Sequence, residues 1–221
     1  MTAITAGEAP VVRIAGADAE REALGPEGHV GATVAAVGPT GVPALEPLVT
    51  VTRGGRTAFY TRCSPARVTE IVSRVEDGDE GDPDAVVEHD PETATLPVPE
   101  LPGLDAGERT VLGACGWRRP TSADDHEAAG GFDDPGPDAV LSAGETLRGR
   151  GWGDLCHDER IGGTWASVRE GADDGAVIVN GHGNPGDALL LASAPFEVID
   201  GATALAEAVG AAEVVVYLSA D

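Results

Sequence analysis

The sequence contains no lysine, and its basic charge rests on arginine alone. Lysine and arginine together number 14, all of them arginine, against 38 aspartates and glutamates, and the formal net charge is -24. A surface with this excess of negative charge repels the phosphates of nucleic acids and of anionic membranes. The composition therefore argues against nucleic acid as a partner.

Disorder and adaptation to salt are two explanations for so acidic a chain, and the apolar content of the sequence distinguishes between them. Hydrophobic residues make up 42% of the chain and recur in runs, which suits folded domains. Concentrated ions screen the repulsion between acidic groups, and the charged surface keeps the protein in solution. We therefore interpret the chain as a halophilic, salt-adapted protein.

Aromatic residues and cysteines are also scarce. Aromatics are 4% of the chain, so the cores depend on Val, Leu, Ile and Ala. The three cysteines, Cys63, Cys115 and Cys156, lie too far apart for a disulfide framework or a cluster of metal ligands. The amino-terminal sequence MTAITAGEAP lacks the basic and apolar parts of a signal peptide, and no apolar run is long enough for a membrane span. The expectation is a soluble cytoplasmic protein without direct membrane insertion.

Residues 1–75 read as a small α/β domain. Apolar runs at 11–15 and 33–37 predict strands. The sequence Arg53-Gly54-Gly55-Arg56 between two β-rich runs predicts a hairpin, because glycine accepts positive φ. Ser64 followed by Pro65 predicts the start of a helix whose apolar face continues to Val75.

Residues 76–107 differ in composition from the segments on either side. They contain many acids and several prolines but no arginine. Like charges repel, and proline blocks both helical and sheet hydrogen bonds. This stretch is interpreted as a solvated, acidic, proline-rich linker between two domains.

Residues 108–221 read as a second α/β segment. Helices are expected near 122–129 and 137–147. The apolar runs at 176–180 and 213–219 suit buried parallel strands, and a helix with an apolar face lies between them. Strand, helix and strand at this spacing predict a βαβ crossover in a parallel sheet.

Two glycine-rich loops in this segment are the candidate binding site. Gly149-Arg150-Gly151 followed by Gly153 has the flexibility to bring backbone N–H groups to a phosphate, and Arg150 adds a bidentate donor. The second loop runs from Asn180 to Gly186, directly after a predicted strand, where ligands of α/β sheets bind. The alternatives are a flavin or nucleotide site and a retained loop shape with no ligand.

These loops resemble the NADH- and FMN-binding subunit family of respiratory complex I and of related hydrogenases and formate dehydrogenases. The resemblance rests on three motifs in the family's order. They are Leu147-Arg148-Gly149-Arg150-Gly151-x-Gly153, then Gly163-x-Trp165, then Asn180-x-x-Gly183-x-Pro185-Gly186. The flanks of these motifs and the Gly38–Leu48 segment, which resembles a ferredoxin motif of the same family, agree as well.

The resemblance implies a fold, cofactors and partners. The expected fold is a thioredoxin-like ferredoxin domain followed by a partial, Rossmann-like FMN-binding α/β domain. The implied activity is hydride transfer from NADH to FMN, with other subunits of a redox complex as partners. The residues carried over to cofactor binding are those of the two loops: Gly149, Arg150, Gly151, Gly153, Asn180 and Gly183.

Several positions depart from the family pattern. Pro39 and Pro43 stand where the family has cluster cysteines, so no iron–sulfur cluster is expected. Thr164 replaces a lysine at the flavin site, and Gly181-His182 replaces an acidic pair. These changes keep open two alternatives: a non-catalytic binding or assembly paralogue, and a truncated remnant without cofactor.

Three other clusters are interpreted as structural. Cys156-His157-Asp158-Glu159 resembles a metal site, but adjacent loop residues seldom converge on one ion, so no metal is expected. Residues 124–127 are read as a solvated acidic helix face. Cys63 and Cys115 are expected to be buried, and the tryptophans to pack rather than stack on a cofactor.

Overall fold

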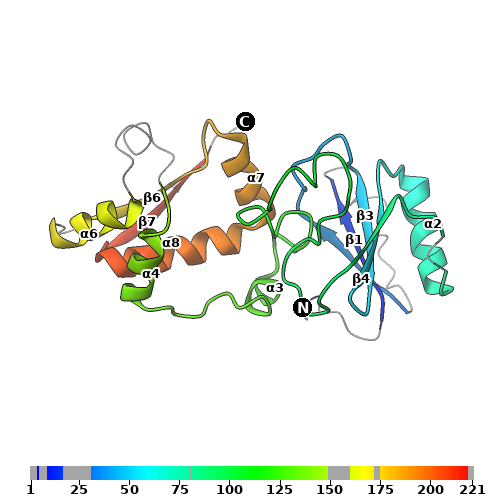
Figure 1. The fold of residues 1–221 in the computed structure, drawn as a ribbon, viewed down its shortest axis with the longest axis horizontal. Helices are drawn as coiled ribbons and strands as arrows, with labels where there is room; N and C mark the ends of the chain where they lie inside the picture. The colour runs from blue at the N-terminus through cyan, green and yellow to red at the C-terminus, as the bar shows by residue number, and fades with distance from the viewer. Residues whose placement is uncertain are drawn as a thin grey trace. The chain divides into compact units, whose positions relative to one another are not determined.

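The computed structural model describes residues 4, 9–16, 31–79, 81–148, 160–171 and 175–218. The chain forms two units (Figure 1). The amino-terminal unit comprises Met1–Gly130 with Leu189–Phe196, and the carboxy-terminal unit comprises Gly131–Ala188 with Glu197–Asp221. Seven strands and six helices lie in the described residues, which confirms an α/β protein.

A mixed five-stranded sheet forms the centre of the amino-terminal unit. Its strands are β1 (Val11–Ala15), β2 (Thr33–Val37), β3 (Leu48–Arg53), β4 (Arg56–Tyr60) and β5 (Ala85–Glu88). The strand order is β2-β1-β3-β4-β5. The β1–β2 pair is parallel, and the other three pairs are antiparallel.

The predicted hairpin and helix are both present. Gly54 and Gly55 connect β3 to β4 with φ angles of 55° and 79°, the left-handed region that glycine occupies without a steric penalty. Helix α2 (Pro65–Glu76) begins after Ser64, whose side chain accepts a hydrogen bond from the backbone N–H of Arg67. This N-cap satisfies one of the helix's free N–H groups.

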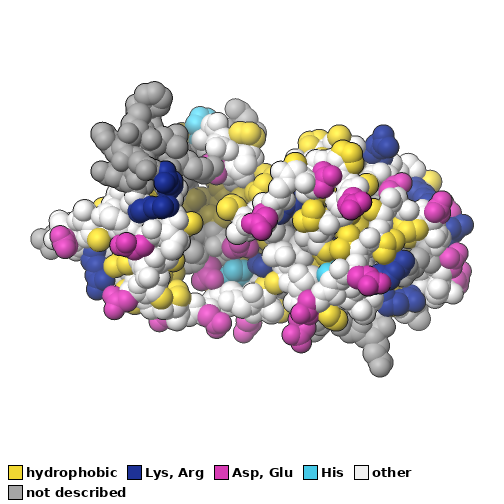
Figure 2. Space-filling view, in the orientation of Figure 1, with side chains coloured by type: hydrophobic (Ala, Val, Ile, Leu, Met, Phe, Trp, Pro, Cys, Tyr) yellow, Lys and Arg dark blue, Asp and Glu magenta, His cyan; other side chains and the backbone are white. Residues whose placement is uncertain are grey.

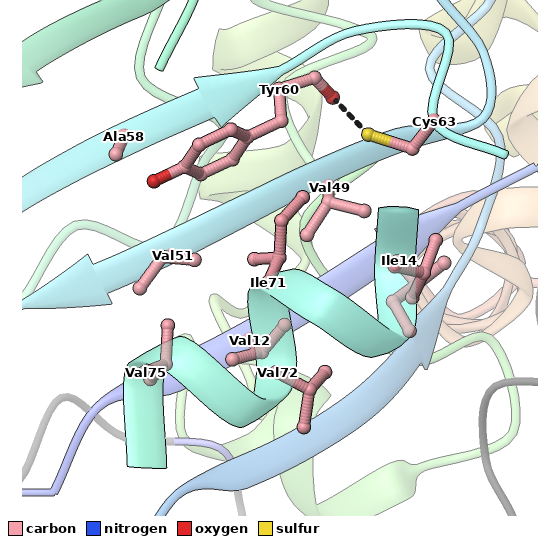
Figure 3. Packing of buried hydrophobic residues seen from close by; sticks show 11 residues of the cluster. Val12, Ile14, Val49, Val51, Ala58, Tyr60, Cys63, Ile71, Val72 and Val75 are labelled. Carbon is pink, nitrogen blue, oxygen red and sulfur yellow. Dashed lines mark hydrogen bonds between the residues drawn. The ribbon is translucent and has the colours of Figure 1, made fainter. Parts of the chain in front are cut away.

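Helix α2 covers one face of the sheet. Its apolar stripe, Val68, Ile71, Val72 and Val75, is buried. The stripe packs on alternate residues of the strands, because successive strand side chains point to opposite faces. Figure 3 shows this packing, with Ile71 and Val72 of α2 beside Val12, Ile14 and Val49 of the sheet.

The other face of the sheet is covered by the segment after β5. Its buried cluster contains Ala15, Val37, Leu48 and Phe59 from the strands, and Leu96, Leu104 and Trp117 from the following chain. The expected solvated linker at 76–107 therefore differs from the structure. Within it, residues 85–88 form β5, and two of its leucines are almost fully buried. Burial alternates along this strand, with Ala85 and Val87 packed against the core and Val86 and Glu88 exposed.

The carboxy-terminal unit contains the predicted βαβ crossover. Strands β6 (Ala176–Asn180) and β7 (Glu213–Tyr217) pair in parallel, with Asn180 opposite Tyr217. Helices α7 (Pro185–Ser193) and α8 (Pro195–Val209) lie between them in the sequence, and Gly210 ends α8 with a φ of 73°. Helices α4 (Pro137–Gly144) and α6 (Ile161–Gly171) pack against each other.

The prediction that β6 and β7 are buried is wrong. Ile178 is 68% exposed, Tyr217 is 55% exposed and Val215 is 41% exposed. These two strands form the whole of their sheet in the described residues. A sheet of two strands has only edge strands, so neighbouring strands shield little of their apolar surface.

No single helix within the described ranges is both long and apolar enough to cross a membrane. The pair α7 and α8 passes that test of length and composition together, but the two helices are bent by 103°.

Candidate functional site

The Gly38–Leu48 segment, which contains Pro39 and Pro43, is closed by its own hydrogen bonds. The backbone N–H and the hydroxyl of Thr40 both donate to Glu46 Oε1, each at 2.6 Å. The backbone N–H of Val42 in turn donates to the Thr40 hydroxyl at 3.1 Å. Thr40 is completely buried, so this carboxylate satisfies polar groups that water cannot reach.

Neighbouring segments fix the same loop from outside. Arg109 Nη2 donates to the Thr40 carbonyl at 2.6 Å, and the Ser193 hydroxyl donates to the Pro39 carbonyl at 2.9 Å. Burial lowers the pKa of Arg109. A methyl group added at Gly116 would lie 2.7 Å from Thr40 Cγ2. The loop is therefore tightly packed, and the Glu46 carboxylate holds it closed by accepting hydrogen bonds from Thr40.

Most of the predicted flavin loop cannot be placed. Gly149, Arg150, Gly151 and Gly153 lie outside the described residues, as does the Cys156–Glu159 cluster. The described flanks of this stretch meet each other. Arg148 and Arg160 form an isolated antiparallel bridge, and Ile161 N donates to the Leu147 carbonyl at 3.0 Å. The two ends of the segment are thus held side by side.

The second loop follows β6 at the carboxyl end of the parallel pair. Asn180 Oδ1 accepts from the backbone N–H of His182 at 3.0 Å, and Gly183 has a φ of 80° with open space where a Cβ would lie. The His182 ring contacts the Tyr217 ring edge-on, with 5.8 Å between centroids. Asn180 and Gly183 therefore share an exposed loop at the position where α/β sheets bind ligands.

The start of α7 limits what this loop can bind. Asn184 Oδ1 accepts from the backbone N–H groups of Gly186, at 2.8 Å, and Asp187, at 3.4 Å. Pro185 has no N–H. The side chain of Asn184 therefore occupies donors that an anion would otherwise use at this helix end.

The acidic helix α3 (Ala123–Glu127) is not the solvated face expected from its sequence. Asp125 is 7% exposed and His126 is 5% exposed. Both Asp125 oxygens accept hydrogen bonds from Arg119, and Oδ1 also accepts from Ile4 N at 2.9 Å. Burial alone would raise the pKa of Asp125, but the hydrogen bonds from Arg119 and Ile4 bring it below its ordinary value.

A cavity beside Asp125 contains a buried arginine that the sequence analysis did not single out. The cavity has a volume of about 520 Å³. Arg13, in the middle of β1, is 4% exposed and lines it. Its Nε donates to the Trp117 carbonyl at 3.0 Å, its Nη1 donates to Thr52 Oγ1 at 3.0 Å, and its guanidinium lies 3.7 Å above the Trp117 ring. Desolvation lowers the pKa of Arg13 to about 10.

A chain of side chains extends this polar region across the sheet. Thr52 Oγ1 lies 2.9 Å from Thr57 Oγ1, which lies 2.8 Å from His89 Nε2. His89 Nδ1 lies 2.7 Å from the Asp90 carbonyl oxygen. The sequence contains a signal that could have revealed this polar region. One arginine interrupts the apolar strand Val-Val-Arg-Ile-Ala, and threonines occupy alternate positions of β3.

Comparisons with known proteins give distant similarity only. No protein-family model matches the chain, and no curated protein is similar to it in sequence. Two crystal structures of an NAD+-reducing NiFe-hydrogenase align with it, in the H2-reduced state (19% identity, TM-score 0.35, 96% of this chain) and in the air-oxidized state (17%, 0.34 and 97%). The chain spans 38% of the hydrogenase chain in both. At these low TM-scores, the chemistry of that enzyme is not assigned to this chain.

Proposed function

We propose that this chain is a flavoprotein segment of a redox complex of the complex-I type, in which hydride passes from NADH to FMN. The observation that carries the proposal is the position of Asn180 and Gly183. Their motif resembles that of the family, and it lies in an exposed loop at the carboxyl end of a parallel strand pair.

The residues of this chain would hold and orient the flavin. Gly183 leaves open space beside the backbone, and His182 and Tyr217 offer ring surfaces at the same sheet edge. The family motif adds Gly149, Arg150, Gly151 and Gly153, with Arg150 as the donor to a phosphate. Bound FMN supplies acceptance of a hydride, and partner subunits would take the electrons onward.

The amino-terminal unit is proposed to be a thioredoxin-like domain that packs against partners and carries no electrons. A parallel β1–β2 pair, followed by the antiparallel β3–β4 hairpin and a helix, supports this fold. Proline at positions 39 and 43 offers no ligand to iron. The loop is instead closed by the hydrogen bonds from Thr40 to Glu46.

A second candidate function is a cofactor-free assembly module, and the exposed surface of β6 and β7 favours it. Ile178, Val215 and Tyr217 present apolar surface that monomeric proteins seldom expose together. A partner strand or helix on this sheet would bury that surface and complete its hydrogen bonding.

Flavin titration separates the two candidates. The full chain in molar potassium chloride is titrated with FMN, and flavin fluorescence and absorbance are followed before and after NADH is added. The flavoprotein proposal expects quenched, bound FMN that NADH bleaches. Arg150→Ala is expected to weaken FMN binding about tenfold or more, through the loss of a charge-assisted contact.

Arg53→Ala, at the end of β3, is the matched control, since it removes the same charge from an exposed position. A folded chain that leaves FMN fluorescence unchanged contradicts the flavoprotein proposal and favours the assembly module. Equal FMN affinity in Arg150→Ala and Arg53→Ala would remove Arg150 from the phosphate site.

A further inference from the structure

The cavity beside Arg13 contains a buried positive charge without a direct counterion. Arg13 is 4% exposed, and no carboxylate of the described residues lies within ion-pair distance of it. Its two hydrogen-bond acceptors, the Trp117 carbonyl and the Thr52 hydroxyl, are uncharged. A buried charge is costly unless an opposite charge compensates it.

The nearest acid cannot supply that charge directly. Asp125 lines the same cavity, but its oxygens accept four hydrogen bonds, three from Arg119 and one from Ile4 N. Asp125 and Arg119 therefore neutralise each other, and the positive charge of Arg13 is left over.

The guanidinium also has donors to spare. Of its five N–H groups, Nε and one N–H of Nη1 are used, and Nη2 donates to no described residue. Trp117 covers one face of the guanidinium, and its own Nε1 is fixed by a hydrogen bond to the Thr93 carbonyl at 3.3 Å. The free N–H edge is thus held rigidly in a cavity of about 520 Å³. A rigid guanidinium edge matches the two oxygens of a carboxylate.

The other residues that line the cavity determine which kind of anion fits beside Arg13. Pro91, Ala94, Trp117 and Ala129 give the cavity apolar walls, and the charged residues Glu92 and Arg118 line it as well as Arg13 and Asp125. Arg118 and Glu92 carry opposite charges, and Asp125 is paired with Arg119, so one positive charge, that of Arg13, remains for one negative charge. A dianion such as phosphate would bring a second negative charge near the ionised Asp125, which repels it. A carboxylate attached to an apolar body satisfies both the charge and the walls.

We propose that the cavity between β1, β3 and the Trp117 segment binds a small organic monocarboxylate, with Arg13 as its anchor. The site belongs to the amino-terminal unit and is independent of the proposed flavin loops. A ligand bound there would contact the amino-terminal unit alone, because every described residue that lines the cavity belongs to that unit.

The test is calorimetric titration of the full chain with acetate, benzoate and inorganic phosphate. Sodium sulfate provides the high ionic strength, and a parallel series in sodium chloride measures competition by chloride. Benzoate is expected to bind more tightly than acetate because its ring contacts the apolar walls, and phosphate is expected not to bind. Arg13→Met is expected to weaken benzoate binding about tenfold or more.

Two further variants separate the contribution of the Arg13 charge to binding from the contribution of the cavity space. Arg53→Met removes the same charge from an exposed position and is expected to bind benzoate like the unmodified chain. Ala129→Leu fills part of the cavity and keeps the charge of Arg13, so benzoate binding is expected to be lost while acetate binding remains. Circular dichroism establishes that each variant is folded.

Three results would overturn the proposal. The first is that the unmodified chain binds none of the carboxylates. The second is that folded Arg13→Met or Ala129→Leu binds benzoate as tightly as Arg53→Met does. The third is that chloride or phosphate displaces benzoate at lower concentration than acetate does, which would make the cavity a site for inorganic anions.

Discussion

At the scale of single residues, the environments of Arg13 and Asp125 depend on contacts far away in the sequence. Alternation along β1 is readable, and it places Arg13 on the face opposite to Val12 and Ile14. The carbonyl that accepts from Arg13 is 104 residues away, in Trp117. Asp125 is buried through Arg119 and Ile4, although its neighbours in the sequence are all polar. Local composition cannot reveal such partners, so it predicted a solvated helix there.

The pairing of Asp125 makes stability depend on pH in a defined direction. Because the pKa of Asp125 is lower in the folded chain than its ordinary value of 3.8, the carboxylate stabilises the fold above that pH. The contribution is lost as the pH falls through the lower, folded pKa. Asp125→Asn is therefore expected to reduce the free energy of unfolding by about 2–3 kcal/mol at neutral pH.

The measurement is urea denaturation of both proteins at constant salt, from neutral pH to below 3.8. The difference between them should shrink at the acidic end, where Asp125 takes up a proton. A difference that is constant over the whole range would show that the charge of Asp125 contributes nothing. Asp124→Asn, on the half-buried neighbour, serves as the control variant.

At the scale of elements, the strands and helices with a clear period were predictable. Residues 11–15, 33–37 and 176–180 form the predicted strands, and Ser64 and Pro65 begin the predicted helix. The strand β5 was missed because its apolar run is only three residues long and lies among acids and prolines, whose propensities outweigh so short a signal. The burial of β6 and β7 was overpredicted, because an apolar run shows what can be buried but not what covers it.

Helices α4 and α6 approach each other at two glycines, and this contact provides a paired test. A methyl group on Gly162 would lie 2.7 Å from Glu145 N and 2.8 Å from Gly144 C, both backbone atoms that cannot move aside cheaply. Gly162→Ala is expected to destabilise the carboxy-terminal unit by about 1–3 kcal/mol.

Gly163, the next residue of the same helix, is the matched control. Nothing lies within 4 Å of its added methyl group, so Gly163→Ala is expected to stabilise the helix by about 0.5–1 kcal/mol. Thermal and urea denaturation measure both variants. Opposite signs are expected; a loss of stability in both variants, or in neither, would contradict the close approach of α4 and α6.

At the scale of the whole molecule, the acidic charge is distributed rather than concentrated. Figure 2 shows Asp and Glu side chains spread over the visible surface of both units. The two arginine–acid pairs on α2 are exposed, and such pairs contribute little to stability. Self-repulsion of a net charge of -24 therefore remains in dilute buffer and is reduced by salt.

Stability is accordingly expected to rise with salt. Between about 0.01 M and 1 M potassium chloride the screening length falls from roughly 30 Å to 3 Å. The melting midpoint is expected to rise by at least about 5 °C, which corresponds to ~1–2 kcal/mol for a chain of this size. Sodium chloride at the same ionic strength should give the same midpoint, because screening does not distinguish the two cations. Equal midpoints in dilute buffer and molar salt would refute the salt adaptation.

The hydrogen bonds from Thr40 to Glu46 have a consequence for how this protein is made in the cell. The donor and the acceptor both belong to the polypeptide and lie six residues apart, so groups that the chain itself carries close the loop. The loop therefore closes as part of the folding of the chain.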